Sequence, residues 1–281
     1  AMIASDIMSS PVYVVGRQEN VAHARRLMLS HRISRLPVLD GDRLVGIITK
    51  KDLAYRLRQS DPVWRRRPID QIPVHVLMVP DPVSVTPDAR VPDIAALMMA
   101  RDVSGLPVLD GKKLAGIVTK TDILRSGSVN SLTTKAGDLM GEAATVNRYH
   151  SLDHVVNLMS ERSEPLVVVN DDGTLAGIIT EGNLALYRYE TDTSAGLPRR
   201  DVKMLRKGES GGRKRYRYVV EVSAVAEDIM SRPVITIGKD EPVTAAVALM
   251  REHHISSVVV TDGGNLAGIV DRDHIIREVA K

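Results

Sequence analysis

Three short motifs in this sequence have residue types and a spacing that could hold a polar ligand. The pairs are Thr49 with Asp52, Thr119 with Asp122, and Thr180 with Asn183. A carboxylate can accept two hydrogen bonds from the vicinal diol of a ribose, each contributing about 1.5–3 kcal/mol because one partner is charged. An acid at the start of a helix also leaves backbone N–H groups available to phosphate. The alternative is a capping box, in which the same residues stabilise a helix without any ligand.

Basic and apolar residues beside these motifs would suit the rest of a nucleotide. Arg35 could bind a phosphate with two parallel hydrogen bonds, and Lys50 and Lys120 would add positive charge. Apolar walls for a flat purine would come from residues 47–48 and 117–118, which read I-I and I-V.

The motifs recur because the chain contains one internal repeat in four copies. The middle strands read L-P-V-L-D at 36–40 and 106–110, L-V-V-V-N at 166–170 and V-V-V-T-D at 258–262. Each copy opens with Asp-hydrophobic-Met or a variant, at 6–8, 76–78, 138–140 and 228–230. Short β-branched runs, apolar residues at helical spacing and an Asp-Gly hairpin turn predict a β-α-β-β-α unit.

We therefore expect an α/β (α+β) protein with repeats at 1–60, 69–127, 132–192 and 220–281, and an insertion at 193–219. Because a unit of about 55–60 residues buries little surface alone, tandem pairing of the repeats is expected to complete a core.

The middle strand L-P-V-L-D and the closing stretch G-I-I-T-K-K-D at 46–52 resemble the CBS domain, named after cystathionine β-synthase. Four copies in one chain look like archaeal stand-alone CBS proteins and the γ subunit of AMP-activated protein kinase. The resemblance covers nearly the whole chain apart from the insertion. It implies two tandem pairs, each with two clefts, arranged as a pseudo-symmetric disk.

The resemblance also implies which residues meet in each cleft. The threonine and acid of one repeat are similar to residues that hold ribose, and the middle strand of its partner repeat lines the adenine and phosphate end. Thr49 and Asp52 would then face Ser104 and Gly105, whereas Thr119 and Asp122 would face Ser34 and Arg35. The stretch H-R-I-S-R-L-P at 31–37 resembles the segment with a phosphate-binding arginine, which implies that role for Arg35.

The third and fourth copies depart from this pattern. Asn183 replaces the acid in the third copy, and Asp271 and His274 stand at the threonine and acid positions of the fourth. Its expected partners, Glu164 and Pro165, would repel phosphate. The complete expected ligand-binding set is Ser34, Arg35, Thr49, Lys50, Asp52, Ser104, Gly105, Ile117, Val118, Thr119, Lys120, Asp122, Thr180, Asn183 and Ser256.

Composition excludes several other kinds of site. The chain has no cysteine, so disulfides, thiolate zinc sites and a cysteine nucleophile are impossible. The histidines lack a convincing metal spacing, and we expect no metal and no cofactor beyond a regulatory nucleotide. No apolar run reaches about 18 residues, and the first residues lack the features of a secretion signal. The expectation is a cytoplasmic protein with no membrane association.

The insertion carries most of the basic character. Residues 199–217 hold nine Lys or Arg and two acidic residues, and the rest of the chain has 29 basic and 33 acidic residues. The segment is predicted to be a hairpin. One interpretation is a solvated surface feature, and the other is contact with RNA, the ribosome or an acidic protein.

Together these patterns predict a non-catalytic regulatory protein that senses AMP, ADP, ATP or a related adenosyl ligand, as in energy sensing. An enzyme is disfavoured because no nucleophile–base motif or phosphate-binding loop is visible. The alternative is a nucleic-acid- or ribosome-binding adaptor that acts through the basic insertion. The choice of adenosyl ligand, a protein partner and a homodimer are left open by the sequence.

Overall fold

The fold was analysed in a computed structural model that describes residues 2–56, 69–162, 164–186, 199–205, 216–222 and 224–281. The first repeat is built from β1 (Val15–Gly16), α2 (Val21–His31), β2 (Arg35–Asp40), β3 (Arg43–Thr49) and the helical turn η1 (Asp52–Arg56). Helix α2 begins where the side chain of Asn20 accepts a hydrogen bond from the backbone N–H of His23 at 2.8 Å. It ends at Arg32, whose left-handed backbone (φ 51°) stops the helix.

The other three repeats have the same order of elements. The second contains α4 (Val91–Arg101), β5 (Gly105–Asp110), β6 (Lys113–Thr119) and α5 (Lys120–Arg125). The third contains β7 (Ala144–Asn147), α7 (Leu152–Arg162), β8 (Leu166–Val169), β9 (Leu175–Ile179) and α8 (Glu181–Leu186). The fourth contains β12 (Thr236–Gly238), α10 (Val243–His253), β13 (Ser257–Asp262), β14 (Asn265–Asp271) and α11 (Arg272–Ala280).

The sheet topology confirms the predicted β-α-β-β-α unit. In the first, third and fourth repeats the first strand is parallel to the second, and the second is antiparallel to the third. In the second repeat β5 and β6 are antiparallel, and an isolated parallel bridge joins Val85 to Val108. Gly41 and Gly111 adopt positive φ at the β2–β3 and β5–β6 turns, which a glycine tolerates without strain.

The opening segment of each repeat lies on the neighbouring repeat of its pair, which the sequence did not indicate. These openings are the short helices α1 (Ala4–Ile7), α3 (Val74–Leu77), α6 (Ala136–Leu139) and α9 (Ala226–Ile229). After α1, Ser9 bridges Ile117 of β6, whereas strand β4 (Val79–Pro80), which follows α3, pairs with β3. The two repeats of a pair are therefore intertwined through their openings.

The hydrophobic cores also join repeats in a way that differs from the expectation. One core contains buried residues of the first and third repeats, such as Met28 and Met159, and the other contains residues of the second and fourth, such as Met98 and Met250. Tandem pairing contributes to each core as expected, since Val74 and Leu77 of the second repeat lie in the core of the first, but each core also crosses from one pair to the other. This occurs because η1 packs against α8, and α11 packs against α4 and α5.

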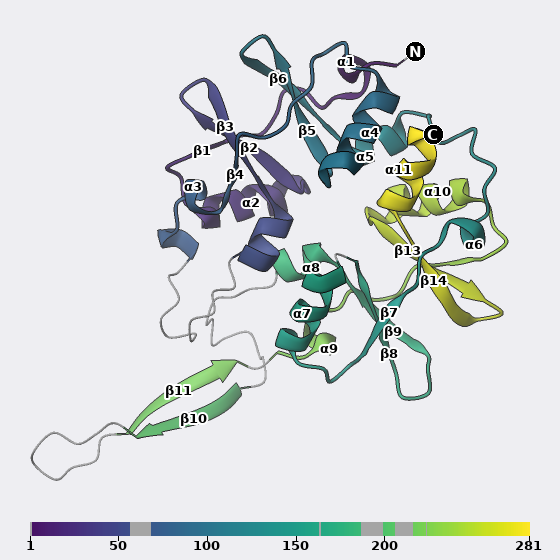
Figure 1. The fold of residues 1–281 in the computed structure, drawn as a ribbon. Coiled ribbons are helices and arrows are strands. Elements are labelled where there is room, and N and C mark those ends of the chain that lie inside the picture. Colours follow the sequence, from purple (N-terminus) through teal and green to yellow (C-terminus); the bar gives the residue numbers. More distant parts are fainter. Residues whose placement is uncertain (1, 57–68, 163, 187–198, 206–215, 223) are drawn as a thin grey trace, which may run out of the picture.

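The four repeats follow one another around a ring in the order first, second, fourth, third (Figure 1). This arrangement fits the predicted pseudo-symmetric disk. A short helical turn, η3 (Ile69–Gln71), precedes α3. In the insertion, β10 (Arg199–Leu205) pairs antiparallel with β11 (Tyr216–Val222). Within the described part of the chain, no helix has both the length and the apolar character needed to cross a membrane.

Candidate functional site

A large cavity lies where the four repeats meet. Its volume is about 1320 Å³, and side chains of every repeat line it. Most of the predicted ligand residues line this cavity: Ser34, Arg35, Thr49, Lys50, Asp52, Ser104, Gly105, Lys120, Thr180, Asn183 and Ser256. The structure thus brings together residues that lie far apart in the sequence.

Four local sites each have at least two residues on this cavity, and we name them by their residues. The residues of the predicted set and of these sites that do not line the cavity are Ile117, Val118, Thr119, Asp122 and His274. The groupings that the resemblance implies are kept as names: cleft A is the set Thr49, Asp52, Ser104 and Gly105, and cleft B is the set Thr119, Asp122, Ser34 and Arg35. Cleft C comprises Thr180, Asn183, Ser256 and Ser257, and cleft D comprises Asp271, His274, Glu164 and Pro165.

Ile117 and Val118 were predicted to form one apolar wall, and the strand separates them. Val118 is fully buried in the core shared by the second and fourth repeats. Ile48 of the first repeat is likewise fully buried, in the core shared by the first and third repeats, whereas its neighbour Ile47 lines the cavity. Successive side chains of a strand point to opposite faces, so only one residue of each pair can face a ligand. Val118 therefore belongs to the core.

The threonine–acid motifs form complete capping boxes in the first two repeats. The backbone N–H and the hydroxyl of Thr49 donate to Oδ2 of Asp52 at 2.8 and 3.0 Å, and the Asp52 N–H donates back to the hydroxyl at 3.3 Å. Thr119 and Asp122 repeat these bonds at 2.8, 3.0 and 3.2 Å. Burial raises the pKa of both carboxyls, and the bonds from the threonines oppose that rise.

The cap engages one carboxylate oxygen and leaves a second for other contacts. Both bonds that the Asp122 carboxylate accepts from Thr119 use Oδ2. Capping and diol binding are therefore compatible in one residue, although the sequence presented them as alternatives.

The third repeat keeps the cap without the charge. Thr180 donates to Oδ1 of Asn183 from its N–H and hydroxyl at 2.8 and 2.9 Å, and the Asn183 N–H returns a bond at 3.4 Å. The amide Nδ2 of Asn183 donates to Ser231 at 2.8 Å. Asn183 thus preserves the helix start but offers no anion to a diol.

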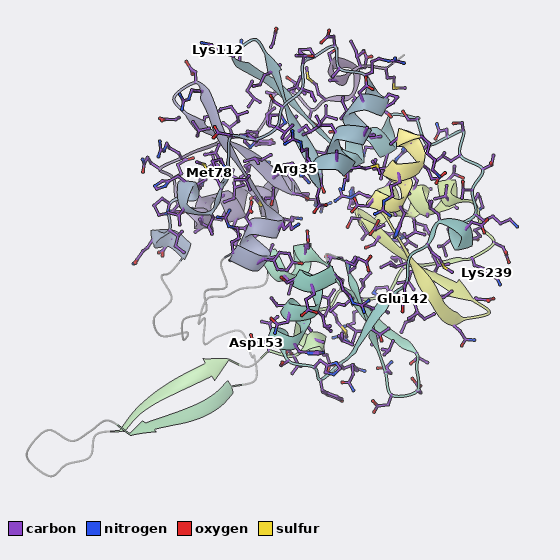
Figure 2. All side chains as sticks on the ribbon, in the orientation of Figure 1. Arg35, Met78, Lys112, Glu142, Asp153 and Lys239 are labelled. Atoms are coloured by element: carbon purple, nitrogen blue, oxygen red, sulfur yellow. The ribbon has the colours of Figure 1, made fainter. Side chains whose placement is uncertain are left out.

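Arg35 lies buried at the seam between the first two repeats. It is 8% exposed, and Figure 2 shows it on the inner side of the first repeat. Its Nε is buried and has no hydrogen-bond partner within the described part of the chain. Burial, together with repulsion from Arg272, lowers its pKa to about 10, and the carboxylates of Asp122, Glu181 and Asp52 oppose this shift. An anion beside this guanidinium would offset both the cost of burying its charge and the repulsion from Arg272.

Residues that follow the capping position link the two pairs, and sequence analysis identified only part of this set. Arg272 donates from Nη1 to the hydroxyl of Thr121 at 2.8 Å, and Lys120 forms an ion pair with Asp273. Burial lowers the pKa of Lys50, and repulsion from Arg272 and Arg35 lowers it further. Comparing the residue after each capping position would have identified Arg272, since Lys50 and Lys120 hold the same place.

Cleft D carries a histidine where the other repeats have an acid or amide. Nδ1 of His274 lies 3.1 Å from both the backbone N of Asp271 and its Oδ1. On the other side of the ring, Nε2 lies 2.8 Å from where a Cβ on Gly141 would stand. The imidazole therefore occupies space that only a glycine at 141 leaves open.

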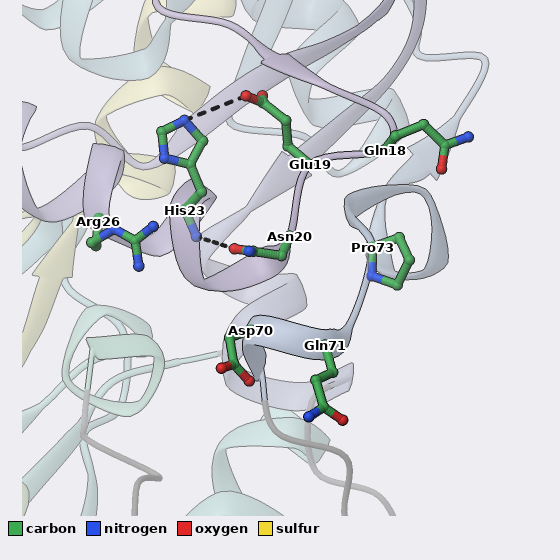
Figure 3. A pocket seen from close by; sticks show the side chains of 8 residues that line it. All are labelled: Gln18, Glu19, Asn20, His23, Arg26, Asp70, Gln71 and Pro73. Atoms are coloured by element: carbon green, nitrogen blue, oxygen red, sulfur yellow. Dashed lines mark hydrogen bonds and ion pairs between the residues drawn. The ribbon is translucent and has the colours of Figure 1, made fainter.

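A second hollow of about 440 Å³ lies outside the ring centre and is polar (Figure 3). His23 faces Glu19 at 3.7 Å across it, and Asn20 caps α2 there. These contacts account for the polar residues as helix-start interactions on the surface. Nowhere in the residues that the structure describes do three or more His, Cys, Asp or Glu side chains form a group suited to a metal ion.

Comparison with known proteins gives a consistent result over the whole chain. The family model for the CBS domain matches residues 4–59, 69–128, 136–190 and 225–281. The structure resembles that of protein MJ1225 from Methanocaldococcus jannaschii, described as a proposed archaeal homolog of g-AMPK, with a TM-score of 0.79, 19% identity and 99% of each chain covered. An uncharacterized 33.4 kDa protein in the ribosomal RNA operon of Thermofilum pendens is 27% identical over 280 residues, which cover 95% of this chain and 88% of that protein.

Other similarities cover only parts of the proteins concerned. The structure of CBSX2 in complex with AMP is 26% identical and covers 45% of this chain and 97% of that one, with a TM-score of 0.39. The chain spans 13 to 30% of the length of the first curated relatives that it matches.

Proposed function

Because this chain belongs to the CBS-domain family, we propose that it is a non-catalytic regulatory protein that binds adenine nucleotides in cleft A and cleft B. The observation that carries this proposal is Arg35, a buried arginine whose Nε lacks a partner among the described residues and which faces the same cavity as Thr49 and Asp52. A guanidinium in that position is suited to a phosphate, and a carboxylate at the cap is suited to a ribose diol.

The clefts can couple ligand binding to the arrangement of the repeats. Each cleft combines the capping motif of one repeat with the middle strand of its neighbour, so a ligand contacts both. A ligand at 100 times its dissociation constant stabilises the bound arrangement by about 2.7 kcal/mol. This is enough to shift an equilibrium between two arrangements of modest energy difference. The signal would reach a protein partner, and we place this activity in the cytoplasm.

Isothermal titration calorimetry of the full chain with AMP, ADP, ATP and adenosine tests the proposal, with GMP as the control for the base. We expect heat of binding for the adenine compounds and a rise in melting temperature with ligand concentration. The proposal is refuted if none of the four binds at millimolar concentration. Comparing AMP with ATP would also show which ligand the protein prefers.

The adaptor hypothesis for the basic insertion stays a prediction. Residues 206–215 lie outside the described residues, as do the side chains of β10 and β11. The hypothesis therefore rests on charge alone, and its test is given below.

A further inference from the structure

The two clefts of the first pair differ at one equivalent position. Arg35 begins β2 and pairs with Thr49, whereas Gly105 begins β5 and pairs with Thr119. Both residues follow a serine and precede Leu-Pro-Val. The pair is otherwise nearly symmetric at this seam, so the arginine and the glycine stand opposite one another.

The side chain of Arg35 crosses the seam and lies against Gly105. A Cβ added to Gly105 would stand 2.5 Å from Cδ of Arg35, 2.8 Å from Nε and 3.0 Å from Nη1. No side chain at position 105 can occupy that space while Arg35 remains in place. The seam therefore accommodates one arginine, and the two clefts have that arginine in common.

The charges around Arg35 come from both clefts. The carboxylates of Asp122 in cleft B and Asp52 in cleft A both act on the guanidinium, as does Glu181 of the third repeat. Its Nε has no partner in the described part of the chain, although the side chain is almost fully buried. Arg35 can therefore serve a ligand on either side of the seam.

The lysines beside the clefts differ from Arg35 in their surroundings. Lys120 is held by Asp273 in an ion pair, and Lys51 lies 3.8 Å from Asp102. Lys50 has a lowered pKa because burial and the two neighbouring arginines disfavour its charge. Lys50 adds to the positive field of the cavity, whereas the three atoms nearest to a Cβ at Gly105 all belong to Arg35.

We propose that Arg35 is a single phosphate-binding residue shared by cleft A and cleft B, so that the first pair holds one phosphorylated nucleotide at a time. This inference rests on the proposed function. Adenosine carries no phosphate and can occupy both clefts at once. A second phosphate would meet the charge of the first in a cavity where repulsion is weakly screened, and it would find Arg35 already engaged.

Native mass spectrometry and calorimetry of the full chain, with adenosine and AMP as separate probes, test this inference. Wild-type protein should bind one more equivalent of adenosine than of AMP at saturation. In Arg35→Ala the tight AMP site should weaken by about 10- to 150-fold, whereas the affinity and the number of equivalents of adenosine should change little. Arg43→Ala, an exposed arginine on β3, is the matched control and should behave as wild type.

Gly105→Ala provides a second variant that retains the arginine. Its new methyl group should displace Arg35 and so weaken AMP more than adenosine. Gly238→Ala is the control, because the nearest atom to its new Cβ would be 3.9 Å away. Urea denaturation of each variant establishes that it is folded.

The outcomes distinguish failure of the sharing of Arg35 from failure of nucleotide binding itself. Equal numbers of AMP and adenosine equivalents in the wild type would overturn the sharing of Arg35 and leave nucleotide binding intact. An Arg35→Ala variant that loses AMP and adenosine equally would assign Arg35 to packing and would also overturn it. Failure of both probes to bind would instead refute the proposed function.

Discussion

The substitution Asp122→Asn can separate the capping role of this residue from its proposed role in ligand binding. Asn183 shows what the variant should look like, because its Oδ1 accepts from Thr180 at 2.8 and 2.9 Å, close to the 2.8 and 3.0 Å that Asp122 makes with Thr119. Asp122 is the third helical residue of the capping box, and an amide oxygen there accepts the same two bonds, so the free energy of unfolding should change by about 0.5 kcal/mol or less. Burial raises the pKa of Asp122 and so disfavours its charge, whereas the neighbouring Arg125 and Arg35 favour it.

Ligand binding should respond differently. The cap uses one oxygen of Asp122, and in the variant the atom left for the ribose diol is an uncharged amide nitrogen. A charged hydrogen bond contributes about 1.5–3 kcal/mol and a neutral one about 0.5–1.5 kcal/mol. The difference of about 1–2 kcal/mol corresponds to an affinity for adenosine in cleft B that is roughly 5- to 30-fold lower.

Calorimetry with adenosine should therefore show one site unchanged and one weakened. Asp52→Asn should give the complementary result for cleft A. In Asp122→Ala the affinity loss should be about 2 kcal/mol, and the bonds that the Asp122 side chain accepts from Thr119 should also be lost, at about 0.5–1.5 kcal/mol of stability. If Asp122→Asn and Asp122→Ala both bind adenosine with wild-type affinity at every site, Asp122 is a helix cap only and the argument for cleft B fails.

Three other predictions concern pH, packing and the insertion. The hydrogen bond to Asp271 raises the pKa of His274 above its usual value near 6.5, although burial opposes the rise. The stability that this pair contributes should be fully present below pH 6.5 and lost as the pH rises through the raised pKa. The free energies of unfolding of wild type and His274→Asn, measured in urea, should converge above that pKa. A difference that grows with pH would contradict this sign. In Gly116→Ala the new Cβ would stand 2.6 Å from Sδ of Met8 and 2.9 Å from the carbonyl of Ser9. The free energy of unfolding, measured in urea, should therefore fall by about 1–3 kcal/mol. An unchanged urea midpoint would argue against the packing of the opening segment on the neighbouring repeat. If the insertion binds RNA, the affinity should fall by about one log unit per log of salt concentration for each phosphate contacted. Replacing Arg213, Lys214, Arg215 and Arg217 with Ser should abolish this binding. A wild-type protein without RNA affinity at low salt would leave the insertion as a surface feature.

The fold could be predicted from the sequence because each repeat repeats the same local signals. Alternating β-branched strands, an Asp-Gly turn and apolar residues at helical spacing recur in every copy, and local patterns of this kind determine secondary structure. The opening segments could not be placed, because a short helix such as Ala4–Ile7 carries no information about which sheet it covers. The packing of Met8 on Gly116 depends on two residues that are far apart in the chain.

The candidate site could be predicted only in part, for a similar reason. The Thr-x-x-Asp motif is local, and its capping geometry formed as the spacing indicated. Arg35 was expected in cleft B, and its contact with Gly105 of cleft A depends on a seam that the sequence does not specify. Arg272 could have been identified as the residue after a capping position, like Lys50 and Lys120, but its bond to Thr121 of the other pair forms only in the folded ring.

The crossing cores have a consequence for the order in which the protein can fold during synthesis. The core of the first repeat includes both Val15 and Ile229, which lie far apart in the chain. Its strand β3 also pairs with β4, Val79–Pro80, which belongs to the second repeat. As the chain leaves the ribosome, the first repeat can form its helix and hairpin early, but its apolar face remains uncovered until the third repeat has emerged. Contacts between residues so far apart in the sequence form slowly, and until they form the chain exposes hydrophobic surface to other chains. Fragments that end after the second repeat should therefore leave apolar surface uncovered on both of their repeats.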